Sequence, residues 1–113
     1  MQPTDQLIVR FILERGKEIY DAQKRFGADP AILASDRAYF NAIAMGLLQV
    51  SFAAKKLSSG FRAKQKKVEW AKIDGWQEPI ADRYRSLTAL DLWAALEVFA
   101  ELYGACFVAE DSL

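Results

Sequence analysis

The sequence predicts an all-α fold, a bundle of four long or medium helices with short connections and short extra helical turns. Apolar residues recur at three- and four-residue steps through most of the chain, as they do on one face of an α-helix. No stretch alternates apolar and polar residues for long enough to predict a β-strand. The 113 residues suffice for one hydrophobic core and not for two, so we expect a single helical domain, residues 1–113.

A first helix is predicted from residues 7–26, where apolar side chains recur at helical spacing with charged ones between them. Thr4 or Asp5 would begin this helix and Gly27 would end it, because these residue types are common at helix starts and ends. The next segment, DPAIL at 29–33, has an aspartate before a proline, which favours an N-cap and a short helical turn.

The second long helix is predicted over residues 36–57, with Ser35 and the aspartate after it as the cap. Most of its apolar residues share one broad face, but Phe40, Leu48 and Phe52 lie outside that face. A helix that is apolar nearly all round is either central in its domain or shared with a second subunit. We therefore expect core packing on one side of this helix and a homodimer contact on the other.

Two shorter helical parts are predicted between this helix and the last one. Residues 61–73 form a basic segment in which Trp70 and Ile73 share one face of a single turn. Asp74 would cap the next helix. Pro79 would be the first residue of that helix or a kink within it, because proline lacks the N–H that a helix interior requires.

The last helix is predicted to begin at Thr88, whose spacing to Asp91 fits a capping box. The single cysteine, Cys106, has no partner for an internal disulfide, and its apolar neighbours indicate a small buried side chain. The apolar residues expected to face the core are Leu92, Leu96, Phe99, Leu102 or Tyr103, and Phe107.

The composition excludes several kinds of active site. The chain has no histidine, which rules out Ser-His-Asp and Cys-His arrangements and the usual base that titrates near neutral pH. With a single cysteine as well, a zinc site is not expected. Any chemistry would come from carboxylates, lysine, tyrosine or arginine, and no cofactor is predicted.

No membrane segment or signal peptide is predicted. The longest uninterrupted apolar run, residues 42–48, is much shorter than the ~20 residues of a membrane helix. The first residues, MQPTDQ, lack the basic and then apolar layout of a signal peptide. These features predict a cytoplasmic protein without a membrane contact.

Positive charge is concentrated between residues 55 and 72, although the net charge of the chain is zero. Such a cluster could bind the phosphates of RNA or of a nucleotide-bearing partner. The alternative is a solvated helix end and loop without a partner. The basic residues are Lys55, Lys56, Arg62, Lys64, Lys66, Lys67 and Lys72, with only Glu69 of opposite sign among them.

Three carboxylates follow this cluster at four-residue steps. Asp74, Glu78 and Asp82 would lie along one side of a helix, where they could hold magnesium and act on a phosphate. The alternative is a first helical turn enriched in acids, which the helix dipole favours. In that case the carboxylates would pair with Arg83, Arg85 or nearby lysines.

Several short patterns between residues 33 and 96 occur together in one order. They are AAKKLS, then FRAK, then a tryptophan three residues before the isoleucine of Ile-x-Gly, then a tyrosine, and then Leu-Trp in the last helix. In this order and spacing they resemble the HepT-like proteins, a branch of the HEPN superfamily also called nucleotidyltransferase substrate-binding proteins. The first helix is compatible with the same family.

The resemblance implies a four-helix bundle that pairs as a homodimer and serves as the toxin half of a toxin–antitoxin pair. In active members an R-N-x-x-x-H-x-Y motif cleaves RNA, and the motifs of two subunits face one cleft. Their partner is a minimal nucleotidyltransferase, which can inactivate the toxin by attaching adenylate to the motif tyrosine.

This chain keeps the position of the motif and little of its chemistry. The motif arginine falls on Gln77, the asparagine on Glu78 and the histidine on Asp82. Only the tyrosine is kept, as Tyr84, which is therefore the candidate modification site. Phe52 also stands where these proteins commonly carry a glutamate.

Two functions follow from these departures. The first is a non-catalytic HepT-like homodimer that binds a minimal nucleotidyltransferase. The second is a ribonuclease toxin that uses other residues, with the basic segment holding RNA and the acidic helix or Tyr84 taking part. Tyr84 is equally interpretable as a core or interface aromatic with its hydroxyl at the edge. Degeneration at several motif positions favours the first function.

Overall fold

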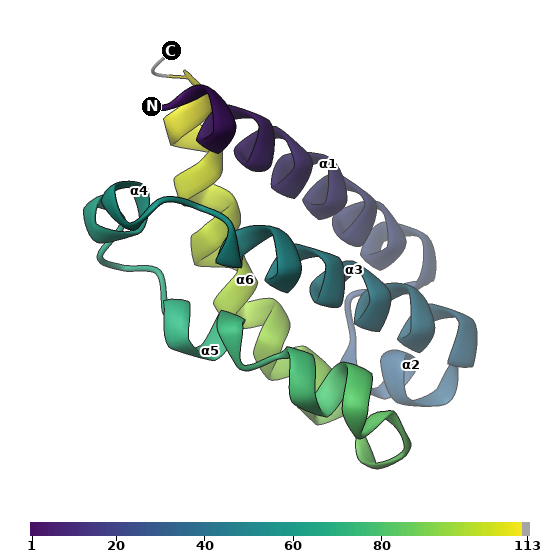
Figure 1. The fold of residues 1–113 in the computed structure, drawn as a ribbon. Helices are drawn as coiled ribbons and strands as arrows, with labels where there is room; N and C mark the ends of the chain where they lie inside the picture. The colour runs from purple at the N-terminus through teal and green to yellow at the C-terminus, as the bar shows by residue number, and fades with distance from the viewer. Residues whose placement is uncertain (112–113) are drawn as a thin grey trace.

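Three long helices form the frame of the molecule (Figure 1). The structure, a computed structural model, describes residues 1–111 and is all-α over this range, as the sequence predicts. Helix α1 (Pro3–Phe26) and helix α3 (Arg37–Lys55) lie side by side, and α6 (Ala89–Asp111) packs against both. The start of α1 and the end of α6 lie at the same end of the molecule.

The hydrophobic core lies among these three helices. Each contributes one row of fully buried apolar side chains, and removing such surface from water is the main stabilising term of the fold. The largest side chains with less than 2% exposure are Tyr39, Phe99, Ile12, Leu33, Ile43, Leu47, Ile73, Leu92 and Leu102.

Local signals at the first connection act as predicted, with small shifts. Helix α1 ends before Gly27, which adopts a φ of 118° that other residues rarely adopt. Asp29 Oδ1 accepts a hydrogen bond from the Ala31 N–H at 2.7 Å and caps α2 (Pro30–Ser35). The predicted start of the first helix at Thr4 or Asp5 is late by less than one turn, since α1 begins at Pro3.

The cap of α3 is the aspartate and not the serine before it. Asp36 Oδ1 accepts a hydrogen bond from the Tyr39 N–H at 3.1 Å. The Ser35 hydroxyl instead donates to the Ile32 carbonyl at 3.2 Å, because Ser35 is the last residue of α2.

The fourth helix is interrupted, which corrects the prediction of four long or medium helices. In place of the helix predicted after Asp74 lie the π-helical turn η1 (Glu78–Asp82) and the 3₁₀ turn η2 (Tyr84–Ser86), and the basic segment before it contains the short helices α4 (Ser59–Lys64) and α5 (Trp70–Asp74). Asp74 ends α5 and does not cap a following helix. Pro79 supplies no N–H, and the Arg83 N–H reaches five residues back to the Glu78 carbonyl at 3.0 Å.

Helix α6 begins with the predicted capping box. The Thr88 N–H donates to Asp91 Oδ2 at 2.9 Å, and the Asp91 N–H donates to Thr88 Oγ1 at 3.1 Å. Cys106 is buried as predicted, and its burial, with a smaller effect of the nearby Glu110 carboxylate, raises the pKa of the thiol to about 12. The prediction for Phe107 is wrong, since this side chain is 55% exposed while Cys106 continues the buried row.

Helix α6 is also the helix within residues 1–111 whose length and composition would allow it to cross a membrane. It has 23 residues and a mean hydropathy of 1.5 over its most apolar window, of which 33% is buried inside the protein. The core helix of a soluble protein meets the same criterion. The expected absence of a membrane contact therefore stays a prediction.

Candidate functional site

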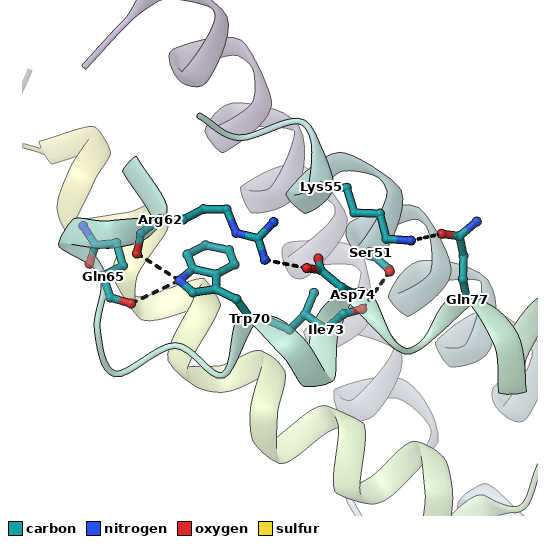
Figure 2. Close-up of polar contacts among 8 residues, drawn as sticks. All are labelled: Ser51, Lys55, Arg62, Gln65, Trp70, Ile73, Asp74 and Gln77. Atoms are coloured by element: carbon teal, nitrogen blue, oxygen red, sulfur yellow. Dashed lines mark hydrogen bonds and ion pairs between the residues drawn. The ribbon is translucent and has the colours of Figure 1, made fainter. Parts of the chain in front are cut away.

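The segment that carries the motif positions lies along one flank of α3 (Figure 2). Lys55, in the last turn of α3, donates a hydrogen bond from Nζ to Gln77 Oε1. One helical turn earlier, the buried Ser51 hydroxyl donates to the Ile73 carbonyl at 2.7 Å. Because Ile73 is itself fully buried, these contacts fix α5 and the residues after it against α3.

An arginine holds the connection between α4 and α5. Arg62 Nη2 pairs with Asp74 Oδ2 at 2.6 Å, and its guanidinium lies 4.7 Å from the centre of the Trp70 ring. Trp70 Nε1 donates to the carbonyls of Arg62 at 3.1 Å and Gln65 at 3.2 Å. The Asp74 carboxylate is thereby used to fix this loop, although its Oδ1 atom is buried without a hydrogen-bond donor.

Tyr84 is half-buried and fixed against the first half of α3. Its hydroxyl donates a hydrogen bond to Asn41 Oδ1, and its ring meets the Phe40 ring edge-on at 5.9 Å. The Arg37 guanidinium lies over both rings, 4.2 Å from the centre of Phe40 and 5.4 Å from that of Tyr84. Tyr84 thus has the contacts of a structural aromatic whose hydroxyl lies at the edge of the core.

The three acidic candidates do not form a metal site. Asp74, Glu78 and Asp82 lie on two separate elements, because the helix that would have aligned them is interrupted after Asp74. Asp74 pairs with Arg62, and Glu78 pairs with Arg83 at 3.3 Å. Within residues 1–111, no three acidic or cysteine side chains are close enough together to hold a metal ion.

The basic cluster divides into separate parts. Lys55 and Arg62 make the contacts described above, and Lys72 pairs with Glu69 at 3.0 Å. Lys56 lines a groove between α1 and α3, whereas Lys64 lines a different hollow near the two chain ends. Lys66 and Lys67 are exposed in the loop before α5. The seven residues therefore differ in their contacts and in the hollows that they line.

Sequence reasoning missed a buried carboxylate. Asp5 is only 3% exposed, and its two oxygens accept from the Ser58 N–H at 2.9 Å and the Ser58 hydroxyl at 2.6 Å. The same hydroxyl caps α4 by accepting from the Phe61 N–H at 3.1 Å. The helical period would have indicated that Asp5 is buried, because Asp5 lies one turn before Val9 on the same face of α1 as Val9 and Ile12.

Two further residues of the site, Arg37 and Asn41, carry no signal in the sequence. They are exposed polar residues on α3, and only the folded chain brings them to Tyr84.

Comparison of the chain with protein-family models, with curated proteins and with solved structures found no match. The resemblance to the HepT-like branch therefore rests on the sequence patterns alone.

Proposed function

We propose that the chain is a non-catalytic HepT-like protein of the HEPN superfamily, a homodimeric helical module that binds a minimal nucleotidyltransferase in a toxin–antitoxin-like pair. The ordered patterns between residues 33 and 96 support the family. The all-α fold is compatible with it, although one of the four expected helices is broken into short pieces.

The use of the motif positions for contacts within the chain is the observation that carries the proposal. Gln77 carries no charge and accepts a hydrogen bond from Lys55. The Tyr84 hydroxyl donates a hydrogen bond to Asn41 Oδ1, and Glu78 pairs with Arg83. Each of these side chains holds the segment in place, and none combines a free proton donor with a positive charge.

RNA cleavage needs both a free proton donor and a positive charge. Attack of a ribose hydroxyl on its phosphate requires proton transfer and stabilisation of negative charge on the phosphoryl oxygens. Asp82 is exposed and negative where active members place a histidine, so it would repel the phosphate. The metal-assisted alternative loses its geometric basis, because Asp74, Glu78 and Asp82 are not aligned on one helix.

A protein partner fits this edge of the molecule better than a nucleic acid. Its exposed charges are of both signs, with Glu78 and Asp82 beside Arg83 and Arg85. Mixed charges favour a matching protein surface over a uniformly negative phosphate backbone. Adenylate transfer to Tyr84 by such a partner would first have to break the hydrogen bond to Asn41.

Incubation of the purified chain with single-stranded RNA tests the loss of catalysis. We expect no cleavage above the buffer control, with or without magnesium, and no difference between wild type and Tyr84→Phe, because no motif position offers the required acid or cation. An active HEPN ribonuclease serves as the positive control for the substrate.

Cleavage in either condition would contradict the non-catalytic assignment. If cutting needed magnesium, Asp74→Asn and Glu78→Gln would identify the carboxylates concerned. If cutting occurred without metal and stopped in Tyr84→Phe, the tyrosine would be catalytic.

A further inference from the structure

A groove runs along the outer face of α1 and α3. Two adjoining hollows of about 430 and 290 Å³ form it, and Arg15 and Gln49 line both of them. The lining comes from α1 and from α3 with its C-cap residue, Lys56. No other helix within residues 1–111 contributes to this surface, which we call the α1/α3 groove.

The groove is straight, because each helix contributes one row of side chains. On α1 the row runs from Leu7 to Ala22 at steps of three and four residues, and on α3 it runs from Met45 to Lys56 at the same steps. The row on α1 is ~22 Å long at 1.5 Å per residue. The groove therefore has the length of a helix of about four turns.

The groove gathers apolar side chains that remain in water. Of the eight large apolar residues that are exposed within residues 1–111, four line it. They are Leu7 (67% exposed), Phe11 (37%), Met45 (54%) and Phe52 (44%). Contiguous exposed apolar surface of this kind marks an interaction site more often than isolated residues do.

The larger hollow carries positive charge and no negative charge. Its charged lining residues are Arg15 and Lys56. Within residues 1–111, no carboxylate pairs with the Lys56 ammonium. Arg15 Nη2 pairs with Glu18 at 2.8 Å, but Arg15 Nε is buried without a hydrogen-bond acceptor. A carboxylate from outside the chain would satisfy this donor and remove the cost of leaving it unpaired.

From these features we infer that the α1/α3 groove binds an amphipathic helix of another protein, with acidic residues beside its apolar row. The apolar row packs between Leu7, Phe11 and Phe52, as helices do when they dock into a groove between two others. The acidic residues lie against Arg15 and Lys56, whose charges they complement. A nucleic acid fits this surface less well, because the phosphate backbone would meet apolar side chains in the groove.

This inference is independent of the proposed function. Ser51 and Lys55 hold the motif segment, whereas Phe52 and Lys56, each one residue further along, face the groove about 100° around the helix axis. A homodimer that joins the motif segments of two chains, as the resemblance implies, would leave the groove open. The groove thus adds a second binding surface on another flank of α3.

Selection from a displayed library of random peptides, each about 15 residues long to match the groove, tests the inference. The purified chain is the target, and Phe52→Glu is the counter-target because its carboxylate would make the groove polar and repel acids. We expect the enriched peptides to carry apolar residues at steps of three and four, and more Asp and Glu than Lys and Arg. An absence of enrichment over the counter-target, or an excess of Lys and Arg, would overturn the inference.

Fluorescence anisotropy with the most enriched peptide measures the part of each side chain. Phe52→Glu and Leu7→Glu should each weaken binding at least about tenfold, because each places a carboxylate against the apolar row of the peptide. Lys56→Glu should weaken binding about fivefold, and less at high salt, which screens exposed charges. Wild-type affinity in both Phe52→Glu and Leu7→Glu would contradict the placement of the peptide.

Two matched controls lie outside the groove. Leu90→Glu adds a carboxylate at an apolar residue that is 73% exposed, and Lys66→Glu makes the same charge change as Lys56→Glu in an exposed loop. Both should bind the peptide like wild type, and circular dichroism verifies that every variant is folded.

Other occupants of the groove would give different results. Sedimentation with vesicles of anionic phospholipid that is lost in Phe52→Glu would assign the groove to a membrane surface. A dimer of wild type that dissociates in Phe52→Glu, with no peptide enriched, would assign it to a second copy of the chain. We expect neither result, and either would overturn the inference.

Discussion

Replacing Phe99 by alanine is expected to lower the free energy of unfolding by about 3–5 kcal/mol, the usual cost of truncating a buried phenylalanine. Phe99 is 0% exposed at the centre of α6. Its ring lies 6.0 Å from that of Tyr20 and 5.8 Å from that of Tyr103, and it is next to the backbone of Gly16. The cavity left behind would remove packing contacts between α6 and α1. Urea denaturation followed by circular dichroism measures the change.

Val108→Ala is the matched control, because Val108 is on the same helix and 68% exposed. We expect this variant to unfold within about 0.5 kcal/mol of wild type, as surface substitutions usually do. A loss of less than about 1 kcal/mol for Phe99→Ala would contradict the packing of α6 against α1.

Replacing Asp5 by alanine is expected to cost about 2–4 kcal/mol, because one hydrogen bond to a charged group contributes about 1.5–3 kcal/mol and two bonds to the same partner residue contribute less than their sum. Asp5 accepts two such bonds from Ser58, and both residues lie at the junction of α1 and α4. Its removal would leave the Ser58 N–H and hydroxyl without their acceptor. The same urea denaturation experiment measures the loss.

Asp21→Ala controls for the loss of a carboxylate, since Asp21 is exposed on the same helix. A double-mutant cycle with Ser58→Ala isolates the pair, because neighbouring residues that share a contact are not additive. Equal losses for Asp5→Ala and Asp21→Ala, or strict additivity in the cycle, would show that the Asp5 contact does not stabilise the fold.

Features fixed by local chemistry could be predicted from the sequence. The caps at Asp29 and at Thr88 with Asp91 depend on residues two or three positions apart, and both form as expected. The periodicity likewise predicts α1, α3 and α6. The interrupted fourth helix could not be predicted, because Pro79 is compatible with a helix start, a kink or a break.

The sequence predicts which residues belong to the candidate site, but it does not predict which side chains they contact. The positions of Gln77 and Tyr84 follow from counting along the chain. Their partners do not, since Lys55 is 22 residues from Gln77 and Asn41 is 43 residues from Tyr84. The predicted row of acids failed for the same reason as the fourth helix, because it assumed that one continuous helix carried all three.

The orientation of α3 connects these observations. Sequence periodicity indicates that this helix is apolar nearly all round, and the structure divides its surface among three uses. Ile43 and Leu47 are fully buried in the core, Ser51 and Lys55 hold the motif segment, and Phe52 lines the groove. A charged residue in place of Phe52 would present a polar surface there instead.

Native mass spectrometry of the chain, co-expressed with a minimal nucleotidyltransferase of the kind proposed as its partner, tests the central claim most directly. A non-catalytic binding module should be recovered as a complex that holds two copies of this chain, and Tyr84→Phe should not prevent its assembly. Recovery of this chain without the nucleotidyltransferase in every preparation would contradict the account.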